Sequence, residues 1–285
     1  MNKTREEIEK SMVLTSGSFN HDKQGQNMSK ENKELVNRLI AQAMELQRRF
    51  NLAEKTALIL EQMLSTDNGL NEAIDNTYEA HTFATLRMQL FRSLIVDLYA
   101  AVFDDNPRTG SVRAILKELR RDTKALDALR EYHSDPDCLE IEVTGDNVSA
   151  EDITLHTETM KARHRRDAIS SFDALWSKID QNSNILNTDE AQRIKWARVK
   201  FVAHFDKTDK GLVAIDDEPD VGEGVLKWGE PTDLLNAIHE YAYDVFLLIT
   251  RTSWGNDFTS ISRFYAEAFW DRLKNGSTDL EPPKL

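Results

Sequence analysis

Hydrophobic residues recur every three or four positions along most of this chain, a period that predicts amphipathic helices. The pattern predicts a helix from Ser29 to the Asn68-Gly69 stop, and a second one over about 70–103 that is apolar on most sides and so central in the core. Further helices are expected at about 111–121, 123–132, 152–182, 188–204, 231–250 and 259–274. Asn187 or Thr188 is a suitable cap, and Pro231 suits a first helical position. The pattern therefore predicts an all-α fold, a single helical bundle domain.

The remaining segments lack this period. Residues 1–28 are polar and are expected to form a mobile N-terminal segment, ahead of a helical domain over 29–275 and a C-terminal tail over 276–285. Residues 133–150 predict a loop or a short strand pair. Residues 205–229 are acidic and glycine-containing, which indicates a long exposed loop, and loops of that length are often functional.

The composition narrows the class of protein. Its 285 residues, 40% hydrophobic and 30% charged, are typical of a globular chain, and its single cysteine, Cys138, excludes a disulfide framework. The first residues are charged and precede no apolar run, so no signal peptide is expected, and Leu94–Phe103 is too short to cross a membrane. We therefore expect a cytoplasmic protein without membrane contact.

The formal net charge of −13 opposes nucleic-acid binding by the surface as a whole, so RNA binding would need local basic surfaces. Two segments qualify. One is the run 161–166, which includes Arg165 and Arg166; the other holds Arg193, Lys195, Arg198 and Lys200. The alternative for either cluster is a solvated helix face.

Arg198 and His204 are the candidate catalytic residues. Arginine can bind a phosphate with two parallel hydrogen bonds, and histidine exchanges protons near neutral pH. Six helical positions separate them by about 120°, so they converge only if the helix ends near Ala203 or if two copies of the chain face each other. The alternative for His204 is a cation that stabilises a helix C-terminus. No histidine spacing fits a metal site, so we expect neither a metal nor a cofactor.

The stretch Arg198-Val-Lys-Phe-Val-Ala-His204 resembles the signature of the HEPN superfamily, and Ala203–Asp206 resembles its abortive-infection U-type branch. Leu98–Asp105 followed by Val112–Leu116 is similar to that branch too. The resemblance implies a helical bundle that forms homodimers, and a metal-independent endoribonuclease of phage-defence or toxin–antitoxin systems, with an antitoxin partner. It also implies that Arg198 and Lys200 bind the RNA phosphate and that His204 is the general acid or base, leaving a 2′,3′-cyclic phosphate.

Val199 departs from this pattern, because active members usually carry a polar residue directly after the arginine. Two other functions therefore stay open. One is a catalytically silent HEPN-fold module that binds RNA or a protein. The other is a helical interaction protein whose acidic residues 215–223 bind a basic partner.

Overall fold

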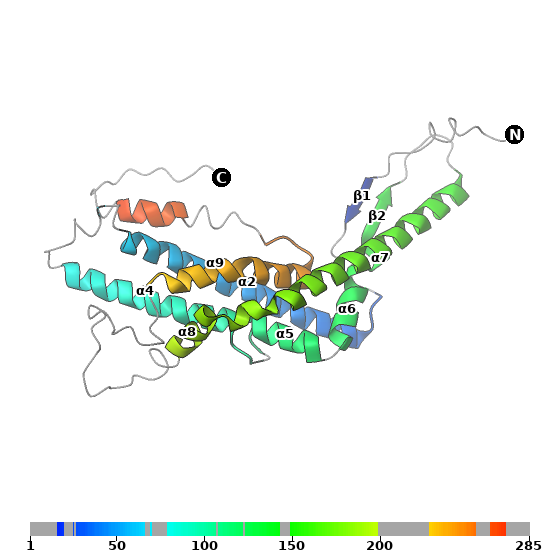
Figure 1. The fold of residues 1–285 in the computed structure, drawn as a ribbon. Coiled ribbons are helices and arrows are strands. Elements are labelled where there is room, and N and C mark those ends of the chain that lie inside the picture. The colour runs from blue at the N-terminus through cyan, green and yellow to red at the C-terminus, as the bar shows by residue number, and fades with distance from the viewer. Residues whose placement is uncertain are drawn as a thin grey trace. The chain divides into compact units, whose positions relative to one another are not determined.

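The computed structural model describes residues 16–19, 25, 27–65, 69, 79–106, 108–121, 123–142, 149–198, 228–254 and 263–271. The described helices confirm the all-α class, and a short strand pair accompanies them (Figure 1). By their contacts the residues form two compact units. Unit 1 combines Met1–Leu39 with Leu119–Lys178, and unit 2 combines Ile40–Glu118 with Ile179–Leu285. Whether 29–275 behaves as one domain stays a prediction.

The helices follow the hydrophobic pattern closely. The first is α2, Lys30–Leu64, followed by α4, Glu79–Val102, α5, Val112–Arg121, and α6, Thr123–His133. Then come α7, Ala150–Gln181, α8, Asp189–Ala197, and α9, Glu230–Thr250, with two 3₁₀ segments at Pro136–Cys138 (η2) and Asn182–Asn187 (η3). Residues 263–271 are also helical. None of the described helices is long and apolar enough to cross a membrane.

Unit 1 contains the strand pair. Strand β1, Ser16–Phe19, runs antiparallel to β2, Leu139–Glu142, with Ser16 opposite Glu142 and Phe19 opposite Leu139. The sequence predicted β2 as one option for its segment, but β1 lies within residues expected to be a mobile lead-in. The turn before α2 is tied to the same region, since the buried Asp135 carboxylate accepts the backbone N–H of Gly25 at 2.7 Å.

Helices α6 and α7 of unit 1 are joined by one arginine. Arg130 donates to the carboxylates of Asp173, at 2.7 Å, and Asp127, at 2.8 Å. Its guanidinium also lies 5.6 Å from the centre of the Phe172 ring. The contacts of Arg130 with residues of both helices therefore combine charge with aromatic packing.

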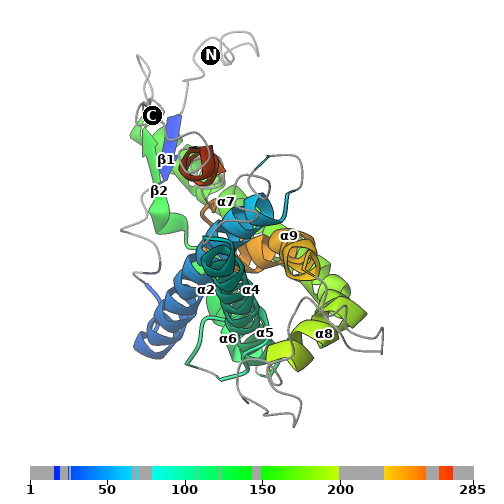
Figure 2. The ribbon, with the colours of Figure 1, turned by 90° about the vertical axis from the view of Figure 1, so that its left-hand side faces the viewer.

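Unit 2 has its core where α4, α8 and α9 pack (Figures 1 and 2). The part of α2 in this unit contacts α4 through Arg49 and α9 through Glu54. Side chains predicted to face the core are fully buried, among them Leu46, Leu60, Leu98, Ile238 and Ile249. The prediction for α4 was wrong in one respect. Its second half is central, with Leu94, Leu98 and Val102 buried. Its first half is only partly buried, because Leu86 is 43% exposed although Phe83 and Leu90 pack against Met63 and Trp270. The apolar pattern did not show which faces of the first half are exposed.

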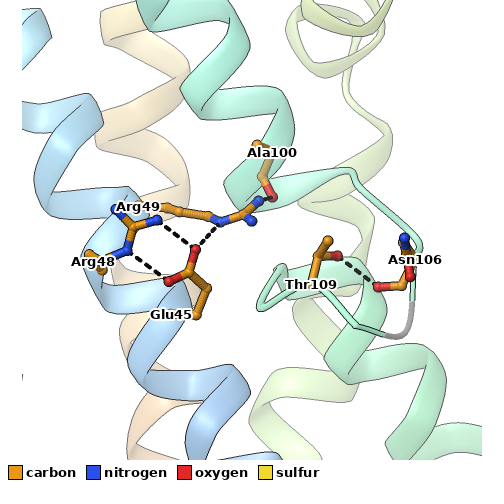
Figure 3. Close-up of polar contacts among 6 residues, drawn as sticks. All are labelled: Glu45, Arg48, Arg49, Ala100, Asn106 and Thr109. Carbon is orange, nitrogen blue, oxygen red and sulfur yellow. Dashed lines mark hydrogen bonds and ion pairs between the residues drawn. The ribbon is translucent and has the colours of Figure 1, made fainter.

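The C-terminal end of α4 is fixed to α2 by a polar network (Figure 3). Arg49 donates to Glu45 Oε1 at 2.8 Å and to the carbonyl oxygen of Ala100 at 2.9 Å. Arg48 donates to the same carboxylate, and its hydrogen bond is the largest contribution that lowers the pKa of Glu45 to about 2. The carboxylate therefore stays ionised and holds both arginines at ordinary pH.

Candidate functional site

Helix α8 carries most of the second basic cluster, and its start is set by local chemistry. The Thr188 hydroxyl accepts the backbone N–H of Ala191 at 3.3 Å, which confirms that a cap lies at this point. Asp189 and Glu190 follow in the first turn, where the helix dipole favours negative charge. Ala191, Ile194 and Ala197 are fully buried and hold the helix in unit 2.

The helix ends at Ala197, with Arg198 as its C-cap residue. The predicted continuation to His204 lies outside the described residues, as do Val199, Lys200 and His204 themselves. Arg198, Arg193 and Lys195 are described, and the structure gives them three different environments. At about 100° per residue, Arg193 lies on a different side of the helix from Lys195 and Arg198, which are three residues apart and neighbours.

Arg193 is engaged by two carboxylates. Its guanidinium lies 3.1 Å from Glu230 in the first turn of α9 and 3.4 Å from Glu190 on its own helix. The Glu230 side chain is only 16% exposed, so the ion pair that joins α8 to α9 is partly shielded from water. The role of Arg193 in RNA binding stays a prediction, and in this structure its donors serve the packing of two helices.

Replacing either carboxylate partner of Arg193 is expected to lower the free energy of unfolding, but by different amounts. Glu230→Gln is expected to lower the free energy of unfolding by about 1–2 kcal/mol, because it leaves a partly buried guanidinium under-paired. Glu190→Gln is the matched control: it also lies in the first turn of a helix and contacts Arg193, but it is solvent-exposed, and we expect little change. Urea unfolding of both variants measures the difference. Equal losses would contradict the assignment of Glu230 as the helix-joining partner.

Lys195 points into the unit. Its Nζ donates to the carbonyl oxygen of Leu186 at 3.3 Å and lies 4.6 Å from the centre of the ring of Phe103, the residue that follows α4. Burial, with a smaller contribution from the positive charge of Arg113, lowers the pKa of Lys195. Its ammonium group therefore already has a carbonyl and a ring as partners.

Arg198 has a different setting. Its Cζ lies 4.8 Å from the centre of the Tyr99 ring of α4, and the side chain is partly buried. Within the described ranges, no hydrogen bond or ion pair engages its guanidinium. Of the three described cations of this cluster, Arg198 is therefore the one whose N–H donors have no anionic or carbonyl partner among those residues.

The other basic cluster lies in unit 1, on α7. Arg165 and Arg166 are exposed, whereas Lys161 binds Asp137 at 3.1 Å and Arg163 lies 3.5 Å from Asp167. The structure thus leaves the two predicted RNA-binding arginines of this run at the solvent-facing surface of their unit. Their role in RNA binding stays a prediction.

A cavity of about 500 Å³ lies in unit 2 between the second half of α2, the start of α9 and Arg263. Its lining includes the carboxylates of Glu54, Glu61 and Asp233, and none of the predicted site residues. Three carboxylates against one arginine would repel a phosphate. This hollow is therefore not the nucleic-acid site that the cations of α8 suggest.

Sequence reasoning missed Tyr99 and Phe103, the two rings that contact the cations of α8. The available signal was their spacing of four residues on one helix, which places them on one face. They lie in the stretch Leu98–Asp105 that carried the second part of the resemblance.

Comparison with known proteins supplies the family. A family model described as AbiU2, of the HEPN type, matches residues 26–269. None of the curated proteins and none of the solved structures compared with the chain matches it. Since the matched range covers most of the 285 residues and includes both basic clusters, the chain belongs to the HEPN/AbiU2 family, which is linked to abortive-infection defence.

Proposed function

We propose that this protein binds RNA through Arg198 and cleaves it without a metal ion, with His204 as the general acid or base. The observation that supports the proposal is the setting of Arg198. Its guanidinium is placed over Tyr99 at the end of α8, and no described carboxylate competes for its donors. A planar guanidinium in that state can bind a phosphate with two parallel hydrogen bonds and stabilise the charge that develops on it.

The spacing of Arg198 and His204 leads to a proposal about the oligomeric state. Because Arg198 and His204 are six positions apart in sequence, we propose that two copies of the chain form a homodimer whose motifs line one cleft. Light scattering with size-exclusion chromatography measures this directly, and a monomer at all concentrations would argue against it. We further propose a cytoplasmic site of action and an antitoxin-type partner.

Substituting Arg198 by alanine tests the proposal that this residue binds RNA. We expect Arg198→Ala to weaken RNA retention about tenfold and to lower the slope of log affinity against log salt concentration by about one, because one phosphate contact is lost. Filter binding with total RNA at several salt concentrations measures both. Lys30→Ala is the control for net charge, since the Lys30 side chain is 92% exposed and, among the described residues, forms a surface pair with Glu34. An Arg198→Ala protein that retains RNA like the Lys30→Ala control would refute the proposal.

Val199 favours a second candidate, a silent module that binds RNA without cutting it. Valine has no group that can hydrogen-bond a phosphate or orient a histidine. This candidate predicts that the wild-type chain retains RNA without cleaving it and that Val199→Asn raises cleavage. Cleavage by the wild-type chain would exclude it.

A further inference from the structure

Two aromatic rings at the end of α4 meet two cations at the end of α8. Tyr99, in the last turn of α4, and Phe103, directly after that helix, are four residues apart, with ring centres 6.1 Å from each other. Lys195 and Arg198 are three residues apart on α8. The Lys195 ammonium lies 4.6 Å from the Phe103 ring centre, and the Arg198 Cζ lies 4.8 Å from the Tyr99 ring centre. The two helices therefore make two successive cation–π contacts, which we call the inner and the outer pair.

The inner pair, Lys195 with Phe103, stabilises the packing of the core. Phe103 is 2% exposed, and Lys195 also donates to the Leu186 carbonyl oxygen. Loss of the Phe103 ring would leave this hydrogen bond in place and would open a hole in the core. Its effect would be on stability.

The outer pair, Arg198 with Tyr99, differs in both respects. Both side chains are partly exposed, and among the described residues Tyr99 is the partner that fixes the guanidinium. A cation–π contact depends on charge over the ring face, so it holds the group without an oxygen that would compete for the N–H donors. Arg193 shows the contrast, because its donors are turned to the carboxylates of Glu230 and Glu190.

We infer that Tyr99 is a positioning residue for RNA binding: its ring holds the Arg198 guanidinium in the orientation that receives a phosphate. This inference rests on the proposed function, since it assigns Tyr99 a task in the site where Arg198 binds RNA. Tyr99 is itself anchored, because the next residue of α4, Ala100, accepts a hydrogen bond from Arg49 of α2 at 2.9 Å. The helix end that carries Tyr99 is therefore fixed to α2 by the contact between Arg49 and Ala100 (Figure 3).

The test compares Tyr99→Leu with Tyr99→Phe in the full chain. Affinity for a fluorescein-labelled single-stranded RNA is measured by fluorescence polarisation at several salt concentrations. Tyr99→Leu is expected to weaken binding about three- to tenfold, since leucine offers no ring face to the cation. Tyr99→Phe keeps the ring face and is expected to stay within about twofold of the wild type.

A double-mutant cycle separates positioning from a general loss of structure. If Tyr99 acts through Arg198, the variant carrying both Tyr99→Leu and Arg198→Ala binds no more weakly than Arg198→Ala alone. Tyr99→Leu should also lower the salt slope by about one, as Arg198→Ala does. Phe103→Leu is the matched control at the end of the same helix: it is expected to lower the thermal midpoint and to leave the salt slope unchanged.

The outcomes distinguish this inference from the proposed function. Wild-type affinity and an unchanged salt slope in Tyr99→Leu, together with weakened binding in Arg198→Ala, would overturn the role of Tyr99 and leave the proposed function standing. Unchanged binding in Arg198→Ala would overturn both. The contact itself is read without RNA from the NMR resonance of Arg198 Nε–H. The ring shifts this resonance in the wild type and in Tyr99→Phe, and Tyr99→Leu is expected to abolish that shift.

Discussion

Replacing His204 by alanine is expected to slow RNA cleavage by about 10²- to 10⁴-fold while RNA stays bound, because a general acid or base contributes a factor of that size. Imidazole can take the proton of the attacking 2′-hydroxyl or return one to the leaving oxygen near neutral pH. Arg198 would hold the phosphate during both steps. Binding and proton transfer thus reside on different residues, so Arg198→Ala is expected to reduce retention and His204→Ala is expected to reduce turnover.

Single-turnover cleavage of total RNA, with the protein in excess, measures this effect. Product ends are tested for a 2′,3′-cyclic phosphate, which an attack by the 2′-hydroxyl would leave. His81→Ala is the matched control, because His81 is an exposed histidine of α4 away from the motif in sequence. Equal cleavage by the wild type and His204→Ala would exclude His204 as the catalytic group.

Gly110→Ala is expected to lower the free energy of unfolding by about 3 kcal/mol or more, the upper range for forcing an added carbon into a packed site. An added Cβ would lie 2.2 Å from the carbonyl oxygen of Gln42, 2.7 Å from the Cβ of Glu45 and 2.9 Å from the backbone nitrogen of Leu46. Two of these atoms belong to the backbone of α2, so no side-chain rotation relieves the overlap. The cost therefore comes from the close approach of two backbones.

Gly110 lies in the connection between α4 and α5, next to residues that fix its course. Thr109 donates to the carbonyl oxygen of Asn106 at 2.7 Å (Figure 3), and the hydroxyl of Ser111 accepts the N–H of Ala114 in the first turn of α5 at 3.0 Å. These contacts fix the course of the connection on both sides of Gly110, so the added carbon is not expected to be accommodated by a shift of the loop.

Urea unfolding of Gly110→Ala measures the loss. Gly229→Ala is the matched control, since among the described residues a Cβ there meets the Asp233 carboxylate, at an ordinary contact distance of 3.9 Å. We expect that control to lose less than about 1 kcal/mol, the cost of alanine at a helix N-cap. A Gly110→Ala protein as stable as the control would show that α2 and this connection are not in contact.

The helices could be predicted from the sequence because the hydrophobic period of each helix lies within its own segment. In α9 the stripe Leu235, Ile238, Ala242, Val245 and Ile249 is buried along its whole length, as a period of 3.6 residues requires. The pairing of β1 with β2 could not be predicted, because the two four-residue strands lie more than 100 residues apart and neither has a strong pattern of its own. Strand pairing depends on the partner, and the sequence of one strand does not identify it.

The candidate site was predictable in part. Residue chemistry singled out Arg198, and helix geometry separated it from His204. The partners of the cations were not predictable, because they come from other parts of the chain: Glu230 from α9 for Arg193, Phe103 from the end of α4 for Lys195, and Tyr99 from α4 for Arg198. A run of basic residues therefore indicates where positive charge lies in the sequence, and packing decides which of those charges can meet a ligand.

The interleaving of the two units has a consequence for how the chain is made. A ribosome delivers residues in order, and Met1–Leu39 must wait for the whole of Ile40–Glu118 before the rest of unit 1, Leu119–Lys178, emerges. Unit 2 is likewise incomplete until Ile179 and later residues appear. Contacts between segments so far apart in sequence form slowly, and apolar surface stays exposed during synthesis. Nascent chains halted before Leu119 should therefore be protease-sensitive and depend on chaperones, and neither unit can be excised as a contiguous fragment.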